Sequence, residues 1–185
     1  MNRSYWLFSL LICFVSACRT EPTADELYAA LKPGQARVSI QLDGTDFYAP
    51  QSLFSGQIDM FGSFLRMNLS DQLESNLIVS FSGDDWYKRK PIKRQVFIDN
   101  QVVASVMIGR LTDKVKRRGE GYLMTEGQIT VESISDQKLV MRLIGKAGKY
   151  EFQRTPEKWV TLKGLIVIKN PNFRFRDITK KDVYF

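Results

Sequence analysis

The sequence contains no histidine. That absence removes the usual general base near neutral pH, the Ser–His and Cys–His nucleophile pairs and most zinc sites. We therefore expect no metal, no cofactor and no catalytic residues, and we expect a binding or structural role instead of an enzymatic one.

Cysteine is nearly absent as well. The only two cysteines, Cys13 and Cys18, lie within the first eighteen residues. If the chain is cut between Ala17 and Cys18, Cys13 leaves with the leader and one cysteine remains. No intrachain disulfide can then form, even in an oxidising compartment, so packing alone must stabilise the fold.

Long apolar runs are also missing. The uncharged stretch Tyr5–Ala17 has thirteen residues, whereas a transmembrane helix needs about 20. This stretch follows the basic lead Asn2-Arg3 and ends in small residues, a pattern typical of a secretory signal peptide. We therefore predict a signal peptide over residues 1–17.

The end of this segment, Val15-Ser16-Ala17-Cys18, resembles the lipobox of bacterial lipoproteins. The resemblance implies cleavage before Cys18 by signal peptidase II, a diacylglyceryl group on its sulfur and acylation of its new amine. Several acyl chains give stable anchoring, because each buried methylene contributes about 0.8 kcal/mol. Arg19 replaces the aspartate of the enterobacterial inner-membrane retention pattern, so we expect delivery to the outer membrane of the cell envelope. An ordinary signal peptide ending in cysteine and an uncleaved anchor are the alternatives.

The remaining chain has the length of one domain. Its charge is asymmetric: residues 18–85 hold four Lys/Arg and ten Asp/Glu, whereas residues 86–185 hold 22 and ten. Basic chains often bind polyanions. Nucleic acid is an improbable partner for an exported protein, so anionic lipid, lipopolysaccharide or acidic glycan are the expected classes. The alternative is a solvated surface on which the two halves interleave.

A short helix is predicted after the tether formed by residues 18–22. Thr23-Ala-Asp-Glu26 is a capping box, in which the Thr23 and Glu26 side chains each accept from the backbone amide of the other. Leu27 and Leu31 lie one turn apart on the expected buried side. Lys32-Pro33-Gly34 ends the helix.

From Ala36 onwards apolar residues alternate with polar ones, which predicts β-strands. Turn residues separate the segments: Asp43-Gly44 is a hairpin signal, and hairpins are expected about Asp99-Asn100 and Ser135-Asp136. A final segment, Val183–Phe185, is expected to be a strand that seals the core. The clearest strands are expected at residues 36–42, 51–69 (two strands broken near Gly62), 77–81, 95–98, 102–108, 127–134, 138–145 and 159–169. The fold class is therefore all-β: one antiparallel β-sandwich or barrel of roughly nine to eleven strands over residues 23–185, with one short N-terminal helix.

Two basic stretches are the candidates for ligand binding. The cations could clamp phosphate or carboxylate groups, and the two aromatic residues could stack on a sugar or settle at a membrane interface. The alternative is a pair of solvated loops. The first stretch contains Trp86, Tyr87, Lys88, Arg89, Lys90, Lys93 and Arg94, and the second contains Lys114, Lys116, Arg117 and Arg118.

Five aspartates, at positions 43, 46, 59, 84 and 85, could in principle hold calcium or form a glycosidase pair. None fits a loop with fixed ligand spacing, and turns favour aspartate in any case. We therefore predict a lipid-anchored envelope protein with a binding or structural role. A carboxylate-based hydrolase of envelope glycans and a lipocalin-like carrier of an apolar ligand remain as alternatives.

Overall fold

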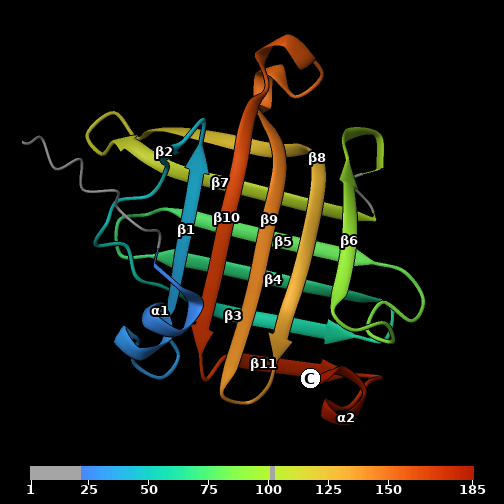
Figure 1. Cartoon of the computed structure of the whole chain (residues 1–185). Coiled ribbons are helices and arrows are strands. Elements are labelled where there is room, and N and C mark those ends of the chain that lie inside the picture. The colour runs from blue at the N-terminus through green and yellow to red at the C-terminus, as the bar shows by residue number, and fades with distance from the viewer. Residues whose placement is uncertain (1–21, 101–102) are drawn as a thin grey trace, which may run out of the picture.

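The computed structural model of the chain describes residues 22–100 and 103–185 (Figure 1). The predicted signal peptide, Cys18 and all of the tether except Pro22 lie outside the described residues. Within the described ranges, no helix has the length and apolar character needed to cross a bilayer.

Eleven strands form one sheet, and the predicted all-β class is confirmed. Eight of them close into a barrel in the order β3-β4-β5-β7-β8-β9-β10-β1, and the pairing of Ala36 with Phe54 completes the ring. Strands β2, β6 and β11 are additions that pair with β1, β8 and β3. The strands are β1 Ala36–Leu42, β2 Thr45–Asp46, β3 Phe54–Phe61, β4 Phe64–Asp71, β5 Asn76–Ser82, β6 Ile92–Phe97, β7 Ala104–Asp113, β8 Arg118–Ile134, β9 Lys138–Lys149, β10 Val160–Lys169 and β11 Asn172–Arg176.

The barrel is flattened into two layers whose strands cross steeply (Figure 1). Strands β1, β10, β9, β6 and the second half of β8 form one layer, and β7, β5, β4, β3 and β11 form the other. β8 belongs to both, since Leu123 pairs with Met107 of β7 and Val131 pairs with Ile92 of β6. Its register shifts after Met124, where it turns the corner between the layers.

The inward side chains of both layers fill the interior. Alternate residues of each strand are buried, as period-two patterning requires; examples are Val38, Leu65, Val79 and Ile166. Trp86, Phe54 and Phe81 are the largest fully buried side chains. The predicted strands at residues 36–42, 77–81 and 159–169 are confirmed, and so is the division of residues 51–69 into two strands.

The predicted capping box is also confirmed. Helix α1, Ala24–Ala30, begins after Thr23, whose hydroxyl accepts from Glu26 N while the Glu26 carboxylate accepts from Thr23 N. Leu31, which follows the helix, is buried, whereas Leu27, predicted on the same side, is only half-buried. A second helix, α2 Lys180–Val183, and the short 3₁₀ helices η1 Ile98–Asn100, η2 Tyr150–Phe152 and η3 Pro156–Lys158 were not predicted.

One predicted hairpin and one predicted strand are wrong. β6 and β7 form no hairpin about Asp99-Asn100, because η1 follows β6 and that strand pairs with β8. The last segment is not a simple strand, because α2 ends at Val183 and only Phe185 pairs with the sheet, through Ile134. In addition, β11 runs parallel to β3, an exception to the otherwise antiparallel sheet.

Candidate functional site

The first basic stretch begins with a core residue. Trp86 is only 1% exposed and its Nε1 donates to the Phe61 carbonyl oxygen at 2.8 Å. Its ring packs edge-on against Phe81, with centroids 5.4 Å apart. Stacking on a free sugar, or insertion at a membrane interface, is therefore not available to this side chain. Trp86 instead fixes the loop between β5 and β6 onto the barrel.

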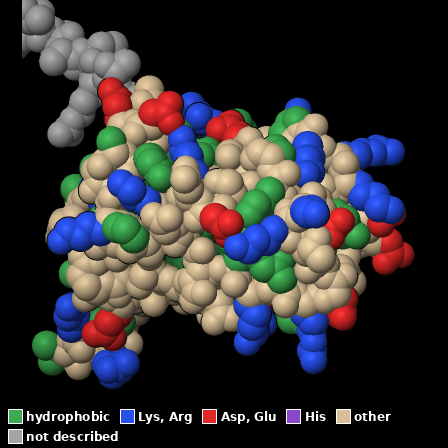
Figure 2. Space-filling view, turned by 90° about the horizontal axis from the view of Figure 1, so that it is seen from below, with side chains coloured by type: hydrophobic (Ala, Val, Ile, Leu, Met, Phe, Trp, Pro, Cys, Tyr) green, Lys and Arg blue, Asp and Glu red, His purple; other side chains and the backbone are tan. Residues whose placement is uncertain are grey.

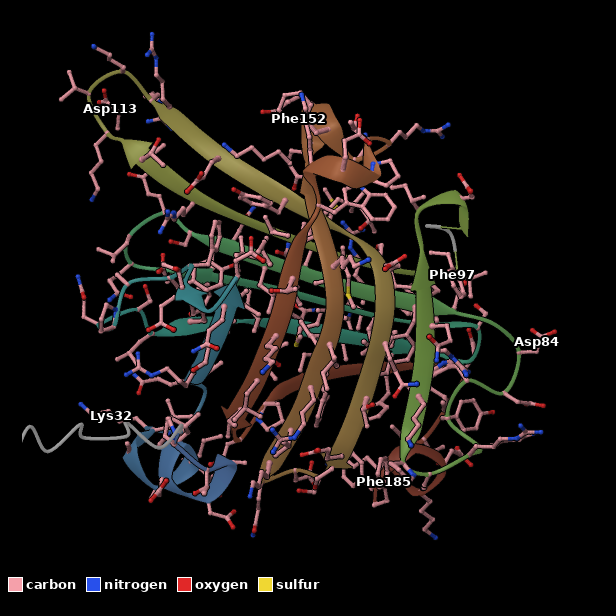
Figure 3. The ribbon with its side chains drawn as sticks, turned by 45° about the horizontal axis from the view of Figure 1, so that its top comes forward. Lys32, Asp84, Phe97, Asp113, Phe152 and Phe185 are labelled. Atoms are coloured by element: carbon pink, nitrogen blue, oxygen red, sulfur yellow. The ribbon has the colours of Figure 1, made fainter. Side chains whose placement is uncertain are left out.

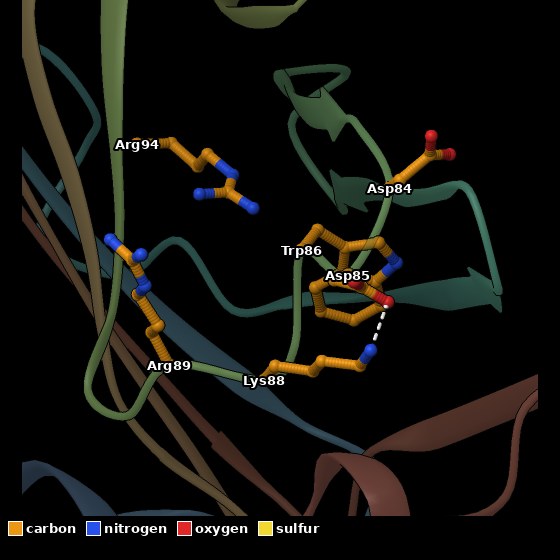
Figure 4. A pocket seen from close by; sticks show the side chains of 6 residues that line it. All are labelled: Asp84, Asp85, Trp86, Lys88, Arg89 and Arg94. Atoms are coloured by element: carbon orange, nitrogen blue, oxygen red, sulfur yellow. Dashed lines mark ion pairs between the residues drawn. The ribbon is translucent and has the colours of Figure 1, made fainter.

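This loop and β6 enclose a surface pocket of about 440 Å³, lined by Asp84, Asp85, Trp86, Lys88, Arg89 and Arg94 (Figure 4). Five of these residues come from the loop, and Arg94 comes from β6. Because side chains alternate along a strand, Arg94 points to the same side as the buried residues Ile92 and Val96. Arg94 thus reaches the pocket from the strand, whereas the other lining residues reach it from the loop.

Arg94 is incompletely satisfied. Its Nε is buried without a hydrogen-bond partner, and its Nη1 donates to the Lys93 carbonyl oxygen at 3.3 Å. Burial, and then the positive charge of Arg89, lower the pKa of Arg94. The guanidinium groups of Arg89 and Arg94 thus line one pocket. Burial of Arg94 and repulsion between the two like charges both disfavour this arrangement. An anion between them would remove that cost.

The carboxylates of the pocket do not supply this anion. Asp85 pairs with Lys88 at 2.7 Å, and this hydrogen bond raises the pKa of Lys88. The Asp84 side chain points away from both arginines (Figure 4). Among the described residues, neither Arg89 nor Arg94 forms an ion pair.

The other members of the first stretch lie outside the pocket. Tyr87 packs against Trp86 at 5.5 Å and is half-buried. Lys90 donates to the Tyr184 carbonyl oxygen at 2.7 Å and lies over the Phe185 ring, which ties the loop to the C-terminal segment. Lys93 is exposed on the opposite face of β6. The predicted cluster therefore divides into a pocket and a set of structural contacts.

The second basic stretch is remote from the first. Lys114, Lys116 and Arg117 occupy the turn between β7 and β8, and Arg118 begins β8. Figure 3 places Asp113, at the base of this turn, at the left of the molecule and Asp84 at the right. The fold does not join the two stretches into one surface.

The remaining aspartates have local partners. Asp43 accepts from the backbone and the hydroxyl of Thr161, each at 2.8 Å. Asp59 pairs with Arg174 at 2.8 Å, and Asp46 accepts from Gln41 at 3.3 Å. In residues 22–100 and 103–185, no three His, Cys, Asp or Glu side chains are grouped as metal ligands would be.

A second cavity, of about 740 Å³, is a groove beside α1 and β1. Leu27 and Leu165 contribute apolar surface to it, while Arg37, Arg142 and Lys163 contribute cations. This groove lies outside the barrel. The closed barrel is compatible with a lipocalin-like carrier but does not identify one. The buried side chains that fill its interior do not favour a carrier.

The fold therefore defines an all-β barrel domain with a basic surface pocket. Comparison of the chain with known protein families, curated proteins and solved structures finds no match.

Proposed function

We propose that the protein is a lipid-anchored envelope protein that binds an oxyanion group in the Arg89–Arg94 pocket without chemically changing it. The anchoring is supported by the N-terminal segment that ends in Val15-Ser16-Ala17-Cys18. In the family that this segment resembles, acylated proteins of the cell envelope carry such a sequence. The outer membrane is the proposed location, since Arg19 follows the cysteine.

The binding role is supported by Arg94. A buried guanidinium nitrogen without a partner, beside a second unpaired arginine, is an arrangement that an oxyanion would complete. Arginine forms two parallel hydrogen bonds with phosphate or carboxylate, which adds geometric specificity to charge attraction. The volume of about 440 Å³ lies within the range of small-molecule sites. A phosphate of lipopolysaccharide and a carboxylate of an acidic glycan have the required chemistry.

The test uses the domain from residue 19 to 185, which retains every contact described above. Inorganic phosphate is titrated while the Nε–Hε resonances of Arg89 and, in the wild type, Arg94 are followed by NMR. Arg89 lines the same pocket and is the readout in the Arg94 variants. We expect a saturable shift that Arg94→Gln abolishes and Arg94→Lys only partly retains, because lysine keeps the charge without the planar fork. The matched control, Lys114→Gln/Lys116→Gln/Arg117→Gln, removes more charge but should leave the titration unchanged.

The source of the anion is then separated by competition. Lipopolysaccharide and a polyuronate are each added to the phosphate-loaded domain, and displacement identifies which of them enters the pocket. If phosphate produces no saturable shift at Arg94, or if the control variant loses binding equally, the pocket is not an anion site.

A further inference from the structure

The β7–β8 hairpin extends beyond the barrel as a separate arm. β5 pairs with β7 only as far as Gly109, and β9 pairs with β8 only from Tyr122 onwards. Residues 110–121 are therefore a two-stranded ribbon with no neighbouring strand on either side. Figures 1 and 3 show this arm projecting at the upper left of the molecule.

The base of the arm is held firmly. Arg110 pairs with Glu120 across the ribbon, donates to the Phe47 carbonyl oxygen and lies 4.7 Å from the Phe47 ring centroid. The turn is also ordered: Asp113 Oδ1 accepts from Lys116 N at 2.9 Å, and Arg117 adopts a φ of 49°. Side-chain contacts therefore hold both the base and the turn of the arm.

The tip combines an exposed aliphatic side chain with cations. Val115 is 94% exposed, the most exposed large hydrophobic residue in the described part of the chain. Lys114, Lys116, Arg117 and Arg118 flank it and are all exposed. Arg117 pairs with Glu74, whose Oε2 lies 3.9 Å from its Nη2.

We propose that this arm docks on an anionic phospholipid bilayer. An apolar tip flanked by cations matches the interface, where an aliphatic group can enter the acyl boundary while cations meet lipid phosphates. A protein-binding surface usually has a larger apolar patch that contains aromatic residues, whereas the tip has a single valine. An anionic glycan would use the cations and leave Val115 without a role.

The position of the arm agrees with this docking. Lys32, which follows α1, and Asp113 both lie at the left in Figure 3, whereas Asp84 and the pocket lie at the right. Figure 2 shows that lysine and arginine side chains are also spread over the rest of the face seen from below. This step rests on the proposed anchoring: residues 18–22 span at most about 17 Å. The anchor and the arm would give two contacts with one bilayer, with the Arg89–Arg94 pocket facing away from it.

The test measures co-sedimentation of the domain, residues 19–185, with vesicles of phosphatidylglycerol and phosphatidylcholine or of phosphatidylcholine alone. Each cation near an anionic surface changes partitioning by about fivefold. Lys114→Gln/Lys116→Gln/Arg117→Gln should therefore weaken binding to anionic vesicles at least about tenfold at low salt. Val115→Asp should remove the part of the binding that persists in high salt, because that part depends on the apolar tip.

The matched control removes three exposed cations from the other side of the barrel, Lys93→Gln/Arg176→Gln/Lys181→Gln, and should bind as the wild type does. Failure of the wild type to bind anionic vesicles, or equal losses in the control and arm variants, would overturn the proposal. If the triple glutamine variant of the arm loses binding but Val115→Asp has no effect, the contact is purely electrostatic. That result would overturn the insertion of Val115 into the bilayer. Phosphate titration of Arg94 in the same proteins reports separately on the pocket, so failures of the two proposals are distinguishable.

Discussion

Trp86 illustrates how a single residue can be assigned to the wrong environment by its neighbours in sequence. It stands next to a run of cations, yet the loop carries it into the barrel, where it contacts Phe81 and Phe61. A tryptophan in a basic stretch has no local pattern that distinguishes an anchor from a ligand-stacking ring. The distinction depends on the loop's path between β5 and β6, which non-local pairing determines.

The core role of Trp86 predicts a graded loss of stability. Trp86→Ala should lower the free energy of unfolding by about 3–5 kcal/mol, because it leaves a large cavity. Trp86→Phe keeps most of the packing but loses the hydrogen bond to Phe61, a cost of about 1 kcal/mol. Urea denaturation of the domain from residue 19 measures both. A near-neutral Trp86→Ala would contradict the burial.

Arg94 could be partly predicted from the sequence. The alternation Ile92-Lys93-Arg94-Gln95-Val96 places Arg94 on the side of the two apolar residues, which separates it from Lys93. What the sequence could not supply is the partner across the pocket, since Arg89 lies on an irregular loop. Of the nine cations predicted as two groups, three line the pocket: Lys88, Arg89 and Arg94.

Cys18 is the residue on which the proposed anchoring depends. Cys18→Ala should leave the protein in the soluble fraction or as the uncleaved precursor, because no thiol is available for acylation. Metabolic labelling with palmitate measures this directly, and Cys13→Ala is the matched control that should still incorporate label. A wild-type protein without label would refute the lipoprotein assignment.

For the helices and strands, sequence signals between neighbouring residues predicted the structure correctly, whereas the pairing of distant strands could not be predicted. The capping box at Thr23 and the hairpin about Ser135-Asp136 involve residues close in sequence, and both are present as predicted. The hairpin about Asp99-Asn100 failed because the local turn signal does not specify a partner: β8 is long enough to bind β7 and then β6 along one edge. The parallel β11 also has no local signature.

The corner of β8 depends on two glycines that face each other across β8 and β9. Gly127 has a φ of +137°, and a Cβ on Gly145 would collide with the Glu126 carbonyl oxygen and lie 2.7 Å from Gly127 Cα. Gly145→Ala should therefore destabilise the domain by about 1–3 kcal/mol, as overpacking does. Urea denaturation of the domain from residue 19 measures this loss. Ile144→Ala is the control: this neighbour is 62% exposed, so its truncation should change the midpoint of urea unfolding little.

At the scale of the whole molecule, the sequence predicted the class and the number of strands but not the choice between sandwich and barrel. Closure rests on one pairing, Ala36 with Phe54, between two strands whose patterns alone would fit either architecture. The steep crossing of the layers likewise depends on the bend in β8, which alternation does not encode.

The domain from residue 19 should give a far-UV circular dichroism spectrum dominated by strand, and the spectrum should be unchanged by reductant. Both cysteines precede residue 19, so the domain contains no thiol that could be oxidised. A helix content near one third of residues, the average of globular proteins, would contradict the fold. A dependence of the thermal midpoint on reductant would contradict the absence of covalent cross-links.

The narrow closure between β1 and β3 also has a mechanical consequence. All seven residues of β1 pair with β10, but one pair joins β1 to β3. Tension on an N-terminal anchor would pass through α1 into Ala36, the residue that forms this seam. In single-molecule force spectroscopy we expect a first step that releases residues 22–53 and lengthens the chain by about 110 Å, while β3 to β10 remain paired. Rupture of the whole barrel in one step would contradict this order. A tethered molecule under load would thus yield first at its membrane side and keep the pocket beside β6 intact.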